Sequence, residues 1–418
     1  MYYGWRVVAV CFVAASFTWG FGVYGASVYL SQITVLLGWP VALVSGGVTT
    51  CYLANAASLT AVGSAVDRWG ARPVFLLGAL MLAAGIAAMG EVAAIWQLYV
   101  AFMLIGLGYA CLSLTGLTAA IGPWFERHQG RSIAIALMGA SIGGMVVVPL
   151  LVVSVDRFGF TLAMSGSSLL TAAVLLPLVA VVLRYRGPSE LGLVPDGGAL
   201  PDVSHPAAAP TRWTRRQAVA TAAFWSATLA FALGLAAQVG FFTHQVNLAR
   251  PVLGNEGAGW LAGATGFANL LGRLLLARIV DEMPVRRYTA AIFGAQAVAL
   301  IALALAGGAA VLIVASLIYG FCLGQITTLS PIVVRREFGA ASFGTIYGIA
   351  ATIIQLTSAF GPGIYGVLHD ALGGYAPVMG IAAGVEVIAM TAMLVGRAPK
   401  QARDKTFAYA RCPLAAKD

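Results

Sequence analysis

Long apolar runs separated by short polar clusters are the dominant pattern of this chain. Between Arg6 and Asp67 there is no Asp, Glu, Lys or Arg, although roughly 20 apolar residues are enough for a helix to cross a bilayer. Similar runs recur to the end of the sequence. Reading them against the polar clusters predicts twelve membrane-spanning helices, at about residues 7–30, 41–66, 73–94, 96–122, 132–155, 160–183, 218–243, 257–280, 288–306, 311–334, 342–367 and 375–396.

One long polar stretch, at about 184–217, interrupts this series. We interpret it as a linker rather than a folded domain, because it contains Pro188, Pro195, Pro201, Pro206 and Pro210. The sequence therefore predicts an all-α integral membrane protein built from two pseudo-symmetric halves. These are an N-terminal six-helix bundle (1–183) and a C-terminal six-helix bundle (218–396), joined by a cytoplasmic linker loop (184–217) and followed by a cytoplasmic tail (397–418).

The composition supports a membrane protein and the charges predict its topology. Only 9% of the residues are charged and 60% are hydrophobic, whereas a soluble domain has about 25% charged residues. The net charge of +9 could suggest a nucleic-acid partner, but the basic residues fall in alternate loops. With both termini in the cytoplasm, Arg157 and Arg250 are the only Lys or Arg residues outside the cell, and Arg273 is the only one within a span. We therefore expect a multi-pass protein of the bacterial inner membrane with cytoplasmic termini, and no nucleic-acid partner.

No pattern typical of an enzyme or a metal protein occurs in the sequence. The five cysteines are scattered, without metal-ligand spacing or a disulfide framework. Neither a phosphate-cradling loop nor a catalytic triad is present, and glycine-rich stretches such as 139–143 lie inside apolar helices, where glycine favours close packing. We expect no metal, no cofactor and no catalytic activity.

The two halves of the sequence echo each other. The second helix contains LANAASLTAVGSAVDRWGARP (53–73) and the eighth contains FANLLGRLLLARIVDEMPVRR (267–287). Aligning Asp67 with Asp281 places Asn55 on Asn269, each twelve residues before the aspartate. In the same way, Pro149 precedes Asp156 near the fifth helix and Pro362 precedes Asp370 near the eleventh. A six-plus-six repeat predicts a transporter whose substrate site lies near the membrane midplane between the halves.

One loop carries a recognisable motif. GSAVDRWGAR (63–72) matches the pattern G-x-x-x-D-R-x-G-x-R and resembles the signature loop of the major facilitator superfamily. A degraded second copy follows the eighth helix, where Ala277 replaces the first Gly but Asp281, Arg286 and Arg287 remain. The resemblance covers the whole chain and implies the twelve-helix major facilitator fold.

Charged residues of these two copies look like a cytoplasmic gate. The candidate gate residues are Asp67, Arg68, Arg72 and Asp281. In such a gate the charges of the two halves pair with each other when the protein faces outward. The alternative is that they only anchor helix ends on the cytoplasmic side. The two roles are compatible.

Three segments resemble a narrower group. The opening YYGWRVV (2–8), the segment 124–143 with Trp-Phe followed by two spaced glycines, and the loop 188–197 are similar to the bacterial oxalate:formate antiporter and monocarboxylate transporter group. The resemblance implies a small organic anion as substrate. We expect symport of monocarboxylates such as lactate or pyruvate with protons, by alternating access, in a monomer embedded in the lipid bilayer.

Arg273 is the sharpest chemical signal. It lies in the middle of the eighth helix, where an uncompensated charge costs at least about 2.5–3.5 kcal/mol, and a guanidinium cannot escape by losing its proton. Its counterpart in the first repeat is Leu59. A guanidinium can bind a carboxylate through two parallel hydrogen bonds, and the resembled group uses an arginine in helix eight for its substrate. Asn269, four residues earlier, lies on the same helix face and could donate to the same ligand. The alternative is a buried ion pair between Arg273 and Glu386.

Other candidate residues have two interpretations each. Tyr24 and Tyr319 line the cavity by the resemblance, although packing is the simpler role. His244 is either an interfacial residue or takes part in proton coupling or the outer gate. Glu386 is intramembrane, and we favour a pairing or oligomer role over proton coupling. The antiporter's helix-eleven lysine has no counterpart in 347–355, so a single cavity cation favours a monoanion over a dianion.

Several functions remain open from the sequence. Animal monocarboxylate transporters carry an aspartate at the spacing of Asn269, so the route of the proton is not evident. Anion exchange of the oxalate:formate type is therefore an alternative to symport. An exporter of a larger apolar compound and a transport-inactive membrane sensor are further alternatives.

Overall fold

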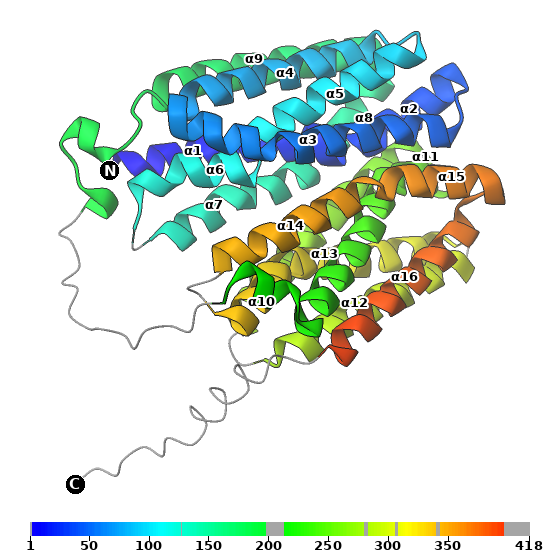
Figure 1. Ribbon diagram of the computed structural model, residues 1–418. Helices are drawn as coiled ribbons and strands as arrows, with labels where there is room; N and C mark the ends of the chain where they lie inside the picture. The colour runs from blue at the N-terminus through cyan, green and yellow to red at the C-terminus, as the bar shows by residue number, and fades with distance from the viewer. Residues whose placement is uncertain are drawn as a thin grey trace.

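A computed structural model describes residues 2–126, 128–197, 213–279, 283–305, 308–339 and 343–396, apart from the side chains at 67, 344 and 345. All regular secondary structure in these residues is helical. Figure 1 shows two bundles of roughly parallel helices, one formed by the blue-to-green chain and the other by the green-to-red chain. Residues 198–212 of the expected linker, Asp281 and the expected tail lie outside the described residues.

The N-terminal half consists of six spans, several of them made of successive helical segments. The first is α1 (Tyr3–Phe17), η1 (Thr18–Tyr24) and α2 (Ala26–Leu37); the next two are α3 (Val41–Trp69) and α4 (Ala71–Gly90); the fourth is α5 (Ile95–Cys111), α6 (Leu114–Ile121) and η2 (Gly122–Trp124); the fifth is α7 (Gln129–Ile142), η3 (Gly143–Val147) and α8 (Val148–Phe158); the sixth is α9 (Phe160–Val182). Two short turns, η4 (Pro188–Leu191) and η5 (Pro195–Gly197), follow.

The C-terminal half starts with the short α10 (Arg215–Val219) and continues through α11 (Ala222–Ile279), α12 (Val285–Leu305), α13 (Ala309–Phe338), α14 (Phe343–Ala359), α15 (Gly361–Leu372) and α16 (Tyr375–Val395). The 58 residues of α11 are two rods, because the chain reverses at Gly254, where φ is 72° and ψ is 179°. Only glycine adopts this conformation readily. We call residues 255–279 the second rod of α11.

The predicted series of twelve spans agrees with this architecture. In the part of the chain that the structure describes, ten helical stretches are long and apolar enough to cross a membrane. The reversal at Gly254 divides one of them in two, and the 29-residue α3 is a further helix of sufficient length that contains more polar residues. The seventh span was predicted too short: its helix continues past residue 243 to the reversal, so His244 lies inside a helix and not at its end.

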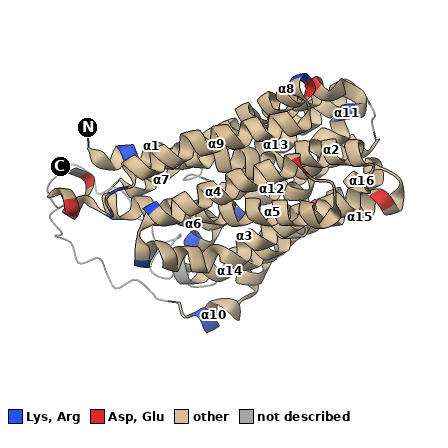
Figure 2. Cartoon of the chain, turned by 90° about the horizontal axis from the view of Figure 1, so that it is seen from above, with Lys and Arg blue, Asp and Glu red and all other residues tan. Residues whose placement is uncertain are grey.

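The charges lie mainly at the two ends of the bundle, with a largely uncharged band between them (Figure 2). Tyr3 and Val395, which begin α1 and end α16, lie at one end, which we call the terminal end. The other end contains the α2–α3, α8–α9 and α15–α16 connections and the reversal at Gly254, and we call it the closed end.

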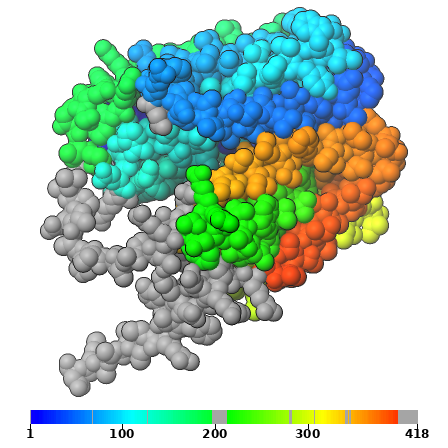
Figure 3. All heavy atoms as spheres, in the orientation of Figure 1, coloured from blue at the N-terminus to red at the C-terminus, as the bar shows by residue number. Residues whose placement is uncertain are grey.

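The two halves meet most closely toward the closed end. α3 packs against α14 and α15, while α11 packs against α2, η3 and α8. One hydrophobic cluster runs through both halves and includes Val48 and Val152 of the first half with Leu261 and Tyr365 of the second. Figures 1 and 3 show α3, in blue, lying along α14 and α15, in orange.

Candidate functional site

The second rod of α11 and the neighbouring α13 build one wall of the candidate site. Asn269 and Arg273 lie one turn apart on α11. A Cβ atom on Gly272 or Gly324 would overlap a backbone carbonyl of the opposite helix, so these two glycines let the backbones approach closely. The close approach brings Thr327 of α13 to Arg273, whose Nη2 donates a hydrogen bond to Thr327 Oγ1 at 3.3 Å.

Arg273 keeps most of its hydrogen-bonding capacity unused. Its side chain is half-buried, and its Nε is enclosed without a partner. No carboxylate of the described residues lies within ion-pair distance of it. A guanidinium has five N–H donors in a fixed fork, and the bond to Thr327 uses one of them. A cation held in this way inside a span is a strong candidate for binding an anion.

Tyr24 supplies the opposite wall from the N-terminal half. Asn269 Nδ2 donates to the Tyr24 hydroxyl at 3.3 Å, a hydrogen bond that crosses between the halves, while Asn269 Oδ1 has no hydrogen-bond partner among the described residues. The Tyr24 hydroxyl and Arg273 are close enough to interact electrostatically. The Tyr24 ring packs edge-on against Phe242 at a centroid distance of 5.8 Å. The fold therefore brings Arg273, Asn269 and Tyr24 together at the boundary of the two halves.

Two π-helical segments position Tyr24, a feature that the apolar pattern does not reveal. η1, which ends at Tyr24, packs against η3 of the fifth span. Gly144 of η3 lies under the Tyr24 ring, where a Cβ atom would come within 2.8 Å of two ring carbons. π-Helical turns in otherwise α-helical spans occur frequently at functional sites. Here they widen the helix where the aromatic side chain turns toward the other half.

Glu386 does not pair with Arg273. It is fully buried in α16, and its Oε1 accepts a hydrogen bond from the Tyr319 hydroxyl at 3.1 Å. Its Oε2 is enclosed and has no hydrogen-bond partner in the described part of the chain. The Tyr319 ring packs on Phe241 at 4.5 Å. The alternative of a buried Arg273–Glu386 ion pair is therefore wrong for this conformation, and so is an oligomer contact through Glu386. In this conformation Tyr319 is fully buried and its hydroxyl is engaged by Glu386.

His244 is part of the interior of the C-terminal half. It is fully buried, so the interfacial interpretation was wrong. One ring nitrogen, Nε2, lies 3.0 Å from the Pro362 carbonyl oxygen, and Nδ1 lies 2.9 Å from the Tyr375 hydroxyl. The neutral ring satisfies both contacts, since Nε2–H donates to the carbonyl and Nδ1 accepts from the phenol. In this conformation neither nitrogen is available to a substrate.

The expected gate residues are only partly described. Arg68 and Arg72 are exposed at the terminal end, and Arg68 lies over the Trp69 ring at 5.7 Å. The side chain of Asp67 and the whole of Asp281 lie outside the described residues. The described ranges contain no group of three or more His, Cys, Asp or Glu side chains placed to hold a metal ion.

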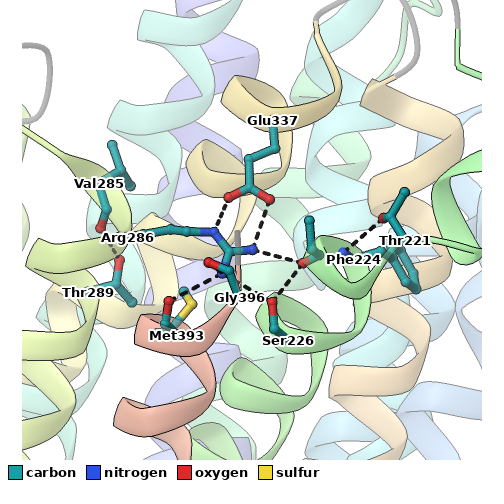
Figure 4. A network of polar contacts seen from close by, with 10 residues as sticks. Thr221, Phe224, Ser226, Val285, Arg286, Thr289, Glu337, Met393 and Gly396 are labelled. Carbon is teal, nitrogen blue, oxygen red and sulfur yellow. Dashed lines mark hydrogen bonds and ion pairs between the residues drawn. The ribbon is translucent and has the colours of Figure 1, made fainter. Parts of the chain in front are cut away.

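Arg286, at the repeat position of Arg72, joins four helices of the C-terminal half (Figure 4). Its Nε and Nη2 donate to the two carboxylate oxygens of Glu337, the second at 3.0 Å. The remaining contacts, at 2.8–3.3 Å, go to the Ala223, Met393 and Gly396 carbonyl oxygens and to Ser226 Oγ. The sequence alone gives Arg286 no role beyond the motif, because only the fold brings its partners together.

Comparison with known proteins agrees with this architecture. The family model of the Major Facilitator Superfamily matches residues 10–362. Human monocarboxylate transporter 11 is 27% identical over 336 residues, which are 75% of this chain and 66% of that protein. Rat monocarboxylate transporter 3 is 25% identical over 94% of this chain and 79% of its own length. The oxalate:formate antiporter of Oxalobacter formigenes is 27% identical over 39% of each protein.

Solved structures support the fold at lower identity. A D-xylose–proton symporter superimposes with a TM-score of 0.74 over 94% of this chain and 98% of its own, at 14% identity. A nucleoside transporter gives the same TM-score over 94% and 99%, at 11% identity. These proteins are membrane transporters and not enzymes. Since the family model covers most of the chain and the helices follow the same plan, this chain belongs to the Major Facilitator Superfamily.

Proposed function

We propose that this transporter moves small organic monocarboxylates across the membrane by alternating access, with Arg273 as the group that binds the carboxylate. The observation that carries the proposal is a guanidinium inside a span with no carboxylate partner among the described residues. The names of the monocarboxylate transporters and the oxalate:formate antiporter among its relatives support the same substrate class.

The site contains groups from both halves, which suits a transport cycle. A carboxylate on Arg273 would lie beside Asn269, whose amide now donates to Tyr24 across the boundary. A ligand that contacts both halves in one state and only one half in another shifts the equilibrium between the states. Binding also neutralises the unpaired cation, which favours an occluded, water-free site. With one cation at the site among the described residues, the preferred substrate is a monoanion.

We infer proton symport as the coupling mode, with exchange of anions as the alternative. Of Glu386 and His244, Glu386 is the better candidate to carry the proton, because its Oε2 has no hydrogen-bond partner among the described residues, whereas both ring nitrogens of His244 are engaged. We further propose a bacterial inner-membrane location with the terminal end in the cytoplasm. In that orientation the closed end faces the outside of the cell.

Uptake into proteoliposomes tests the proposal. Labelled lactate should accumulate under an inward-directed proton gradient, and Arg273→Ala should abolish that accumulation. A protonophore should collapse it if transport is symport, whereas exchange for an internal anion that ignores the pH gradient would indicate an antiporter. Failure of lactate, pyruvate and other monocarboxylates to be transported, or to raise the melting temperature, would refute the substrate class.

A further inference from the structure

Two aspartates that the internal repeat relates to each other reach across the closed end. Asp156 lies in the last turn of α8, in the fifth span, and Asp370 lies in the last turn of α15, in the eleventh. We propose that Asp156 and Asp370 are paired latches that hold the closed end shut, each by binding the start of a helix in the opposite half. This rests on the alternating access proposed above, but it concerns the gate and not the substrate.

The Asp370 latch joins α15 to the start of α3. Asp370 Oδ2 accepts a hydrogen bond from the backbone N–H of Ala42 at 2.8 Å. Ala42 is the second residue of α3, and the residue that precedes the helix, Pro40, provides no side-chain cap. The first N–H groups of a helix lack partners within it and lie at the positive end of its dipole, so a carboxylate is favoured there. The cap of α3 therefore comes from the other half of the protein.

The Asp156 latch joins α8 to the start of the second rod of α11. Asp156 Oδ1 accepts a hydrogen bond from Asn255 Nδ2 at 3.1 Å, and Asn255 directly follows the reversal at Gly254. In the repeat, the second rod of α11 corresponds to α3 and α15 corresponds to α8. The pseudo-twofold symmetry thus exchanges the two latches, which is the arrangement expected of a matched pair across a gate.

Tight helix crossings beside both aspartates bring them within reach. A Cβ atom on Gly366 would overlap the Ser45 hydroxyl where α15 crosses α3, and one on Gly259 would come within 2.8 Å of Val152 Cβ where α11 crosses α8. Gly363 N also donates to Thr49 Oγ1 across the first crossing at 3.0 Å. When the halves separate at this end, both carboxylates lose these partners and α3 loses its cap. The latches therefore favour the state in which this end is closed.

The distance between the halves at this end is the measurement that tests the latches. Leu36 and Leu372 are exposed on opposite halves near the closed end, with 59% and 45% of their surfaces accessible. Both can be replaced by cysteine and spin-labelled in a Cys412→Ser background, since Cys11, Cys51, Cys111 and Cys322 are buried. Without substrate, double electron–electron resonance should show a longer distance population in Asp156→Ala/Asp370→Ala than in the parent, and an intermediate one in each single variant.

Two further variants separate a latch from a general loss of charge. Asn255→Ala should have the effect of Asp156→Ala, and combining the two should add nothing, because both remove the same hydrogen bond. Glu91 is an exposed carboxylate at the same end without a partner among the described residues, so Glu91→Ala should leave the distances unchanged.

The proposal is overturned if the folded double variant keeps the parent's distance distribution. Should the double alanine variant not fold, Asp156→Asn/Asp370→Asn removes both charges with little change in shape and decides the question by the same measurement. No substrate is needed, so the latches can fail while monocarboxylate transport is confirmed, and the reverse outcome is equally distinguishable.

Discussion

Arg273 is the residue on which the proposed function of this transporter depends most. Its charge within an apolar run marks it in the sequence, and in the structure its polar neighbours are uncharged. It bonds to Thr327 and lies next to Asn269 and Tyr24, without a carboxylate partner among the described residues. Ligand binding therefore explains the presence of this charge better than packing does.

Arg273→Lys should keep the charge but cannot form the two parallel hydrogen bonds of a guanidinium with a carboxylate, so transport should fall sharply. Arg273→Ala should abolish the rise in melting temperature on adding a monocarboxylate. Its melting temperature without substrate should stay close to that of the parent, because the change removes an unpaired cation and one 3.3 Å hydrogen bond. A loss of stability of about 3–5 kcal/mol, typical of a broken buried ion pair, would contradict the binding role.

Tyr24→Phe tests the contribution of the N-terminal half to the site. The variant removes the hydroxyl that accepts from Asn269 and leaves the ring packing on Phe242 intact. If the phenol also contacts the bound anion, the loss of one hydrogen bond of about 1 kcal/mol should weaken binding roughly fivefold. Substrate titrations followed by the melting temperature would measure this. An unchanged affinity would place Tyr24 outside the site, and Tyr29→Phe, in the core of the same span, is the matched control.

Individual helices here depend on a few special contacts besides their apolar faces. Glycines let α13 approach the second rod of α11, two π-helical turns shape the first and fifth spans, and a glycine at 254 reverses the chain. The ion pair of Arg286 joins the ends of α11, α12, α13 and α16 (Figure 4). The ion pair of Arg286 and the reversal at Gly254 can be tested without touching the proposed substrate site.

Glu337→Ala should destabilise the C-terminal half by about 3–5 kcal/mol, because it leaves the largely buried Arg286 without its anion. Their side chains are only 7% and 14% exposed, so solvent screens the pair little. Removing both members, in Arg286→Met/Glu337→Leu, should recover much of the loss. Denaturation monitored by tryptophan fluorescence would compare the three proteins. Equal stability of Glu337→Ala and the parent would show that the pair contributes nothing.

Gly254→Ala should cost about 1–3 kcal/mol from backbone strain alone. Its φ of +72° is unfavourable for any residue with a Cβ atom, although no atom would obstruct that Cβ within 4 Å. Gly380 also has free space around it but no positive φ, so Gly380→Ala should be neutral or slightly stabilising. Melting temperatures of the two variants give the comparison. A neutral Gly254→Ala would mean that the reversal tolerates another conformation.

The whole molecule is two helical bundles in contact mainly toward one end, with a cationic site at their boundary. In this arrangement, the selectivity for substrate and the access to the site depend on both halves together and not on either half alone. In the proposed cycle the site receives its ligand from the terminal end while the closed end is shut. Opening the closed end would expose the site to the other side.

Monocarboxylates should outcompete dicarboxylates of similar size, because the site offers one cation among the described residues. Competition of lactate, pyruvate, oxalate and succinate against labelled lactate in proteoliposomes would measure the order. Stronger inhibition by oxalate or succinate would require a second cation at the site and refute the single-charge argument.

The sequence by itself determined the membrane class, the series of twelve spans and the two-part repeat, because bilayer thickness and the avoidance of charge act on every span separately. It also marked Arg273 and Asn269 as candidates for the site, since a charge in an apolar run and a one-turn spacing are local features. Only the tertiary structure decided which groups meet. It separates Glu386 from Arg273, buries His244, brings Tyr24 to Asn269 and places Asp156 and Asp370 across the closed end. Such contacts depend on how helices distant in sequence pack, and hydropathy carries no information about that packing.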